Sequence, residues 1–399
     1  MKILIAPDKF KGSMRASDVA ARVAAGISSV SPDAQVVLVP VADGGDGTLD
    51  AAVGSGFTLV PVTVDGPTGE PVHTGYARKD DMAVVELADS CGLVRLPGGV
   101  LAPLTASSTG FGQVIAAALN NGCRRLVLAI GGSASTDGGA GMLHALGARL
   151  LDSRGEPVPP GGGGLEHIDR VDLSRLHRDL TGAEVVLASD VDNPLLGDRG
   201  AAEVYGPQKG ATPDDVARLD GALRVWSGAV ARALGVPEGD SGHPAADVAG
   251  AGAAGGVGFA AIAVLNATAR PGIDLMLELT GLRDDLAGAD LVVTGEGSLD
   301  EQTLNGKAPA GVAAAARAFG VPVVAVAGRN LLSEKQLTDA GVRNAYALTD
   351  IEPDVQRCID DPGPLLERLG RRIAEDAQRT SSLTNSWRVL PVSQGGETT

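Results

Sequence analysis

Acidic, basic and glycine residues gather in four short segments, each directly after a run of β-branched or other apolar residues. The segments are Asp8-Lys9-Phe10-Lys11-Gly12-Ser13, Asp43-Gly44-Gly45-Asp46-Gly47-Thr48, Gly295-Glu296-Gly297-Ser298 and Gly328-Arg329. Carboxylates can bind Mg²⁺ or take up a proton, lysines can hold an anion, and glycines bring backbone amides close to a phosphate. A single loop of this kind is most often an ordinary turn, but four at one edge of a sheet favour a shared binding site.

A longer glycine-rich segment, residues 131–141 (GGSASTDGGAG), follows the apolar run 126–130 and precedes a predicted helix. Glycines let backbone amides approach an anion, and the start of a helix adds a positive dipole. The segment therefore suits a phosphate, although it lacks the spacing of a P-loop. Residues 108–112 (STGFG) also precede a predicted helix, where capping explains the hydroxyls as well as anion binding does.

Two further segments each contain a residue that could take part in catalysis or binding. The predicted strand 185–189 ends in Asp190-Val191-Asp192-Asn193-Pro194. An Asp beside a second carboxylate at a strand end suits Mg²⁺ or a general base, and a turn before proline explains it equally well. Lys209 lies in a loop between two glycines, and one such lysine alone is usually only solvated.

Residues 250–255 (GAGAAG) match the GxGxxG pattern of dinucleotide-binding proteins, and Asp274 follows at a suitable distance. That fingerprint also needs a β-branched strand immediately before it, and residues 243–249 (HPAADVA) make a poor strand. The segment therefore favours close helix packing, or a helix start that contacts a ligand, over an NAD site.

Composition narrows the class of protein. The chain has 399 residues, and 33 Lys and Arg against 49 Asp and Glu give a net charge of −16, which argues against nucleic acid and anionic membranes as partners. Three widely spaced cysteines and five scattered histidines predict neither disulfides nor a histidine-rich metal site. The N-terminal apolar run is too short for a signal peptide and no stretch is long enough to span a membrane, so we expect a cytoplasmic protein.

The elements that must position these residues follow from the apolar patterns. Residues 2–6, 17–30 and 35–39 read as a βαβ unit, and the alternation of strands and helices returns between residues 290 and 378. Together the two ends predict an α/β fold with a flavodoxin-like parallel sheet of about five strands, into which a second α/β domain is inserted. We expect the first domain at 1–60 plus 286–380, the inserted domain at 61–285, and a flexible tail at 381–399.

The ordered set of motifs resembles the bacterial glycerate kinases of the two-domain α/β type. The motifs are APDKFKGS (6–13), ADGGDGT (42–48), GGSASTDGGAG (131–141), DVDNPL (190–195), GPQKGA (206–211), GAGAAGG (250–256) and TGEGSLDEQTLNGK (294–307). Each motif is weak by itself, but the ordered set is highly specific and covers nearly the whole chain to about residue 350. The chain departs from the usual family pattern at Lys9, at residues 108–113 and at Ser135-Thr136.

The resemblance implies phosphorylation of D-glycerate by ATP with Mg²⁺, 2-phosphoglycerate being the favoured product, in a cleft between the two domains. The residue roles are a hypothesis from charge type and position: Asp190, Lys11 and Glu296 are expected to be catalytic, with Asp190 as general base or metal ligand and Glu296 as a second metal ligand. The expected substrate contacts are Asp8, Lys11, Ser13, Asp43, Lys209 and Asn193. The expected nucleotide contacts are Gly131, Gly132, Ser133, Asp137, Gly138, Gly295 and Gly297.

Three alternatives stay open at this point. The chain could be a kinase for another small hydroxy acid, an NAD-dependent hydroxy-acid dehydrogenase using residues 250–255, or a non-catalytic ligand-binding protein with two α/β lobes. In each case we expect small molecules as partners and a monomer or homodimer.

Overall fold

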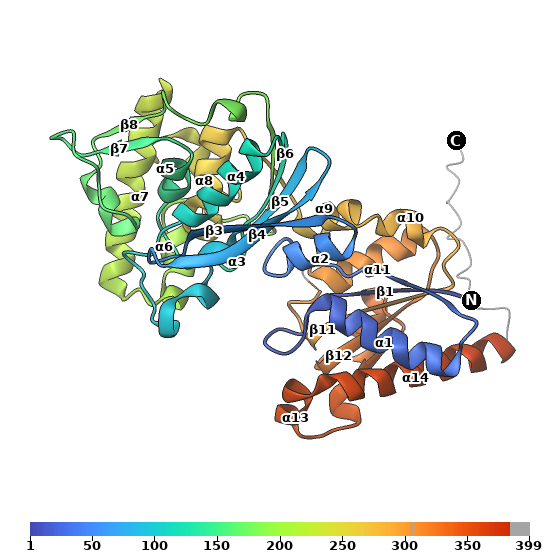
Figure 1. Cartoon of the computed structure of the whole chain (residues 1–399). Coiled ribbons are helices and arrows are strands. Elements are labelled where there is room, and N and C mark those ends of the chain that lie inside the picture. The colour runs from blue at the N-terminus through green and yellow to red at the C-terminus, as the bar shows by residue number, and fades with distance from the viewer. Residues whose placement is uncertain (305, 384–399) are drawn as a thin grey trace, which may run out of the picture. The chain divides into compact units, whose positions relative to one another are not determined.

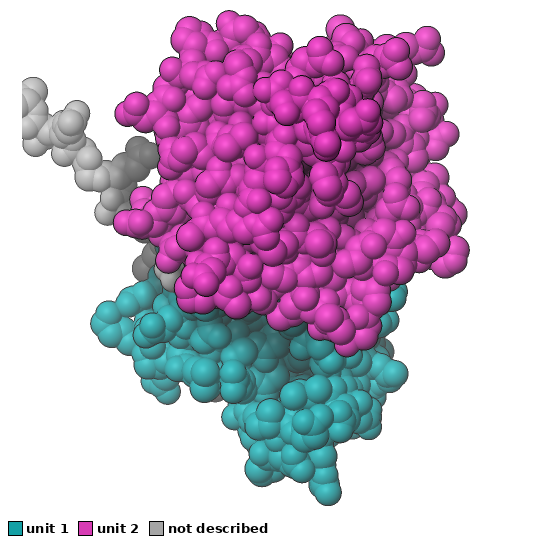
Figure 2. Space-filling view, turned by 90° about the vertical axis from the view of Figure 1, so that its left-hand side faces the viewer, with its two compact units in different colours: residues 1–43, 276–399 teal, residues 44–275 magenta. Residues whose placement is uncertain are grey.

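The computed structural model describes residues 1–304 and 306–383 and divides into two compact units. Unit 1 is formed by residues 1–43 and by the described residues from 276 onward, and unit 2 by residues 44–275 (teal and magenta in Figure 2). No helix of the described residues combines the length and the apolar character needed to cross a bilayer.

Unit 1 is built on a parallel sheet of five strands (Figure 1). The strands are β1 (Lys2–Pro7), β2 (Gln35–Leu38), β11 (Leu291–Leu299), β12 (Val323–Asn330) and β13 (Asn344–Ala347). Their order is β13-β12-β11-β1-β2, and all neighbouring pairs are parallel. Counted within the unit this is the order 5-4-3-1-2, so the predicted flavodoxin-like sheet is confirmed.

Helices lie on both faces of this sheet, which explains why the central strand β1 is buried at every residue from Ile3 to Pro7. Helices α1 (Ala16–Val30) and α14 (Pro362–Leu383) pack together over Ile3 and Ile5 of β1. Glycines permit their close contact, because a Cβ atom at Gly26 would lie 2.1 Å from a backbone oxygen of α14. The remaining helices are α10 (Leu282–Leu286), α11 (Ala308–Ala318), α12 (Glu334–Asp339) and α13 (Val355–Asp360), and α9 (Gly272–Leu279) spans the unit boundary after Leu275.

Unit 2 contains a mixed sheet of six strands in the order β10-β9-β6-β5-β4-β3. The strands are β3 (Thr58–Asp65), β4 (Pro71–Lys79), β5 (Met82–Glu86), β6 (Arg125–Ala129), β9 (Glu184–Ala188) and β10 (Thr268–Arg270). The pairs from β5 to β10 are parallel, whereas β3 and β4 form an antiparallel hairpin that continues into β5. A separate antiparallel pair consists of β7 (Arg149–Leu151) and β8 (Arg170–Asp172).

The helices of unit 2 surround a core whose largest buried side chains are Trp226, Tyr76, Phe111 and Phe259. The helices of this unit are α2 (Thr48–Gly54), α3 (Leu87–Cys91), α4 (Thr109–Asn120), α5 (Ala140–Ala145), α6 (Ala201–Tyr205), α7 (Pro213–Leu234) and α8 (Ala253–Leu265). The Trp226 indole donates to the backbone oxygen of Gly138 at 3.0 Å, so the core of the unit directly supports the glycine-rich loop.

The unit boundaries differ from those expected at residues 60 and 285. The first lies after Asp43, because α2 packs on β4 and β5, and β3 pairs with β4, which makes residues 48–65 part of unit 2. The second lies after Leu275, because α10 packs against α11 of unit 1. The tail expected at 381–399 begins inside α14, and from residue 384 onward it lies outside the described residues.

Candidate functional site

The polar residues of unit 1 meet at the carboxyl ends of its central strands. β1 and β11 are neighbours there, and the amide of Asp8 donates to the backbone oxygen of Gly295 at 2.7 Å. The strand order reverses direction at this pair, which is where open α/β sheets bind their ligands. Gly297 keeps the two loops in contact, since a Cβ atom at that position would lie 3.3 Å from the amide nitrogen of Lys11.

Three carboxylates share this edge: Asp8 after β1, Asp43 beyond β2 and Glu296 in β11. Burial, together with the charges of Asp43 and Glu296, raises the pKa of Asp8 to about 8 against the opposing effect of Lys9. Burial also raises the pKa of Glu296, which is 8% exposed. Oxygen atoms of this type are the ligands that Mg²⁺ prefers, and a cation would relieve the repulsion among them.

Glu296 is held by its own motif. One carboxylate oxygen accepts a 2.6 Å hydrogen bond from the Thr303 hydroxyl, and the other lies 3.7 Å from the Lys307 ammonium. The segment 294–307 therefore folds back so that a hydroxyl and a cation fix the acid.

The two other unit 1 residues of the predicted site behave differently from each other. Lys11 is exposed in the loop after β1, where its ammonium can reach a ligand. The Ser13 hydroxyl instead donates to the backbone oxygen of Ile359 at 2.5 Å, which ties the loop to α13. In this arrangement Ser13 positions the loop that carries Asp8 and Lys11.

In unit 2, the glycine-rich loop 131–141 encloses a fully buried carboxylate. Asp137 is 0% exposed and accepts hydrogen bonds from both the amide and the hydroxyl of Ser108 at 2.8 Å. Its remaining donors are the Ser107 hydroxyl and the amides of Gly139 and Gly141. Asp137, expected to contact nucleotide, thus fastens the loop to the start of α4. Gly131, Gly132, Ser133 and Gly138 belong to the same loop.

The Lys209 side chain contacts this loop from the protein interior. The residue is 2% exposed, and its ammonium donates to the backbone oxygen of Ser135 at 2.5 Å. Burial lowers the pKa of Lys209 to about 8, while the nearby Asp137 charge opposes that effect. A buried cation below a glycine-rich loop adds positive charge where backbone amides already favour an anion.

A neighbouring loop packs backbone to backbone on the same segment. In residues 250–256, Ala254, Gly255 and Gly256 all have positive φ, and a Cβ atom at Gly255 would lie 2.1 Å from the backbone oxygen of Ser135. The amide of Gly138 donates to the oxygen of Gly255 at 2.9 Å. A 3₁₀ turn (Pro244–Asp247), not a strand, precedes these glycines, so the dinucleotide fingerprint is missing. The glycines serve close backbone contact with the loop 131–141.

Asp190 and Asn193 follow β9. One Asp190 oxygen accepts from the amide of Gly272 at 2.8 Å, and the residue is exposed. The Asn193 side chain donates to the oxygen of Arg199 at 2.8 Å and accepts from the Tyr205 hydroxyl at 2.6 Å. Asn193, an expected substrate contact, therefore orders the loop that begins at Asp190.

Glu86 was missed by sequence analysis although it holds one of the motif loops. Its two oxygens accept from the amides of Gly47 at 3.0 Å and Leu49 at 2.8 Å, and the side chain is 4% exposed. Burial raises the pKa of Glu86 to about 7, and Asp46 and Asp89 add to the effect of burial against these two hydrogen bonds. An acid that closes an apolar strand was the available signal, but its partners lie far away in the sequence.

The raised pKa of Glu86 predicts how stability depends on pH. In the folded state the carboxyl holds its proton up to about pH 7, whereas in the unfolded chain it releases it near 4.5. Its contribution therefore becomes less favourable as pH rises from 4.5 to 7, by up to about 3 kcal/mol. We expect the unfolding free energy of Glu86→Gln relative to the parent to rise over this interval, as measured by urea denaturation at pH 5 and pH 8. An unchanged difference would mean that the folded carboxyl titrates normally.

The described protein side chains of one unit do not by themselves form a complete set of metal ligands. Among residues 1–304 and 306–383, no group of three or more His, Cys, Asp and Glu side chains is arranged to hold a metal ion. The two expected ligands belong to different units, Glu296 to unit 1 and Asp190 to unit 2. Their oxygen chemistry fits Mg²⁺, which characteristically takes one or two carboxylates and completes its shell with water and substrate phosphate.

Comparisons with known proteins agree with this arrangement. The model of the glycerate kinase family matches residues 3–378. Glycerate kinase of Halalkalibacterium halodurans is 41% identical over 93% of this chain and 97% of its own length. Glycerate 2-kinase of Escherichia coli is 41% identical over 82% of this chain and 85% of its own length.

A solved structure extends the likeness to three dimensions. A crystal structure of a Salmonella typhimurium LT2 protein assigned as glycerate kinase 2 superimposes with a TM-score of 0.81 at 39% identity. The alignment covers 96% of this chain and 99% of that one. The motifs, the sheet order of unit 1 and the full-length matches agree, and the chain belongs to the glycerate kinase family.

Proposed function

We propose that the protein transfers the γ-phosphoryl group of ATP to D-glycerate, at the hydroxyl of C2. The observation that supports this most directly is the 41% identity to the Escherichia coli glycerate 2-kinase over 82% of the chain. The carboxylates, lysines and glycine-rich loops described above are residue types that phosphoryl transfer requires.

The chemistry is mainly one of charge and position. The transition state spreads negative charge over the transferred group, so catalysis depends on cations, aligned amides and a correctly placed acceptor hydroxyl. In the proposal, Lys209 and the loop 131–141 hold phosphate oxygens, and Lys11 binds the glycerate carboxylate or a phosphate. Gly295 and Gly297 bring the backbone of β11 close to the loop after β1, where Asp8 and Asp43 lie.

Mg²⁺ is part of the proposal and would neutralise charge on the triphosphate when bound. Glu296 and Asp190 are the proposed ligands, with Asp190 as the alternative general base that takes the proton of the acceptor hydroxyl. The protein's own contribution is to hold Glu296 between Thr303 and Lys307, and Asp190 against the amide of Gly272. The cleft between domains, the monomeric or dimeric state and the cytoplasmic location remain predictions of the sequence.

The product identifies both the substrate and the hydroxyl. Incubation with ATP, Mg²⁺ and D-glycerate is expected to give a new ³¹P resonance of a phosphomonoester. Phosphate on C2 couples to a single proton and gives a doublet, whereas phosphate on C3 couples to two and gives a triplet. A triplet would overturn the regiochemistry. Turnover of another hydroxy acid with none of glycerate would favour the alternative kinase.

A further inference from the structure

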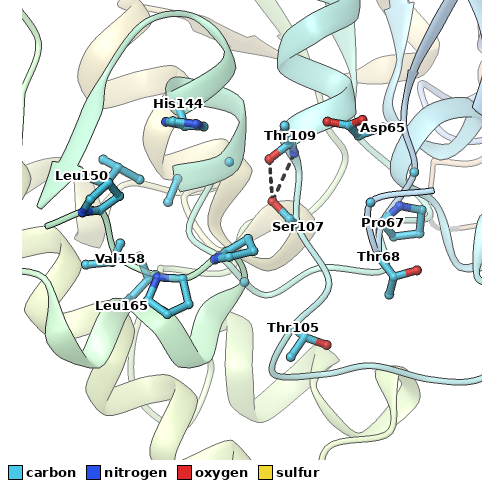
Figure 3. Close-up of a pocket in the computed structure, with 18 of the residues that line it drawn as sticks. Asp65, Pro67, Thr68, Thr105, Ser107, Thr109, His144, Leu150, Val158 and Leu165 are labelled. Carbon is cyan, nitrogen blue, oxygen red and sulfur yellow. Dashed lines mark hydrogen bonds between the residues drawn. The ribbon is translucent and has the colours of Figure 1, made fainter. Parts of the chain in front are cut away.

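Unit 2 contains a cavity of about 450 Å³ to which none of the residues discussed so far as ligands of glycerate belongs (Figure 3). Its lining comes from the end of β3, the segment before α4, the first turn of α5, β7 and the loop 157–161. The volume falls within the roughly 300–1,000 Å³ typical of small-molecule sites.

The cavity has two chemically different sides. Leu150, Val158 and Leu165 form a mainly apolar side, on which His144 also lies, and Figure 3 shows these residues across from Asp65, Thr68 and Thr109. An apolar face opposite hydroxyl and carboxylate groups matches a ligand with one flat apolar part and one part rich in hydroxyls.

Asp65 is held in a fixed position on the polar side. The Gln113 amide nitrogen donates to one carboxylate oxygen at 2.7 Å, and the Gln113 oxygen accepts from the Asp65 backbone amide at 2.7 Å. A carboxylate has about four acceptor positions, so this pairing leaves capacity for further donors. Carboxylates of this kind bind ribose hydroxyls in many nucleotide sites.

The cavity reaches the C-terminal end of the glycine-rich motif. Gly141 lines the cavity and is also the last residue of the 131–141 motif, where its amide donates to Asp137. Ser107 lines the cavity as well and donates to the same carboxylate. A ligand in the cavity with a phosphate chain would therefore have that loop as its immediate neighbour.

We propose that this cavity binds the adenosine part of ATP, with the base against Leu150 and Val158 and the ribose hydroxyls on Asp65. The inference rests on the proposed kinase function and adds to it the site that takes the nucleoside. It separates that site from the strand-end residues of unit 1, which leaves Asp8, Asp43 and Glu296 for the reacting groups.

Two variants test the inference through the Michaelis constants. Asp65→Asn keeps an acceptor for Gln113 but removes the charge, and the KM for ATP is expected to rise about tenfold with the KM for glycerate unchanged. The parent enzyme should use 2′,3′-dideoxy-ATP about tenfold less well than ATP, and Asp65→Asn should lose this discrimination. A general structural defect would not remove a preference for ribose hydroxyls.

The second variant, Val158→Phe, fills the cavity from its loop and is expected to raise the KM for ATP by at least tenfold. Val225→Phe makes the same change at an exposed position of α7 outside the cavity and should leave both constants unaltered. Unchanged KM for ATP in both cavity variants, with glycerate still phosphorylated, would overturn the nucleoside site and leave the kinase function intact.

A direct measurement covers the case in which the parent enzyme does not phosphorylate glycerate. That result would overturn the proposed function, and calorimetric titration with ADP would then decide the cavity separately. Weaker ADP binding in Asp65→Asn and Val158→Phe than in Val225→Phe supports the nucleoside site, whereas equal binding in all three contradicts it.

Discussion

Replacing Asp190 by asparagine is expected to lower kcat by about 10²–10⁴-fold in an assay that couples ADP release to a chromogenic reaction. The side-chain oxygen of asparagine can still accept the 2.8 Å hydrogen bond from Gly272, so the loop after β9 should keep its shape. What the substitution removes is the negative charge that a proton acceptor or a metal ligand needs.

Asp192→Asn is the matched control, since it makes the same change two residues further along the loop. Asp192 is exposed and lies 3.0 Å from the Arg199 guanidinium, an ion pair of the kind that contributes little to stability. We expect kcat within about twofold of the parent for this control. A kcat within about tenfold of the parent for Asp190→Asn would show that Asp190 is neither the base nor an essential metal ligand.

Replacing Lys209 by methionine is expected to lower kcat/KM by at least about 10²-fold while the protein becomes no less stable. The ammonium is buried and its pKa lies at about 8, so near neutral pH the folded protein bears the cost of a charged group out of water. Methionine fills a similar volume without that cost. Lost activity in a protein of undiminished stability would identify Lys209 as a group that acts on the anionic ligand.

The pH dependence provides an internal check on this variant. The folded pKa lies below the unfolded value of 10.5, so the penalty is complete below pH 8 and disappears as pH rises from 8 to 10.5. The stability advantage of Lys209→Met in denaturant titrations should therefore shrink between pH 7.5 and pH 10. Lys335→Met, an exposed lysine paired with Asp339 at 2.8 Å, should show neither effect. Full activity of Lys209→Met would leave Lys209 with a structural role alone.

Much of the fold could be predicted from local patterns. In unit 1, short β-branched runs separated by helical crossovers allow parallel pairing alone, and the handedness of such crossovers restricts the possible strand orders. The boundary near residue 44 could not be found in the same way. Helix α2 and strand β3 follow β2 without a break in composition, and only their packing on β4 and β5 assigns them to the other sheet.

The candidate site could be predicted in part, because the strand order determines which loops meet. Parallel strands bring their carboxyl ends to one edge, which is why Asp8, Asp43 and Glu296 could be expected together. Sequence cannot distinguish a side chain that faces a ligand from one that holds the loop. Asp137 and Asn193 are of residue types that often bind ligands, yet their side chains form hydrogen bonds with neighbouring residues of the protein.

The position of β1 in its sheet has a consequence for synthesis on the ribosome. β1 lies between β2 and β11, and the Thr294 hydroxyl donates to the Ala6 oxygen across a separation of 288 residues. During synthesis β1 therefore gains its neighbour β11 only after unit 2 has been translated in full. Unit 2 consists of one continuous stretch and can fold before the sheet of unit 1 is complete. Because pairings between distant residues form slowly, we expect unit 1 to fold later than unit 2.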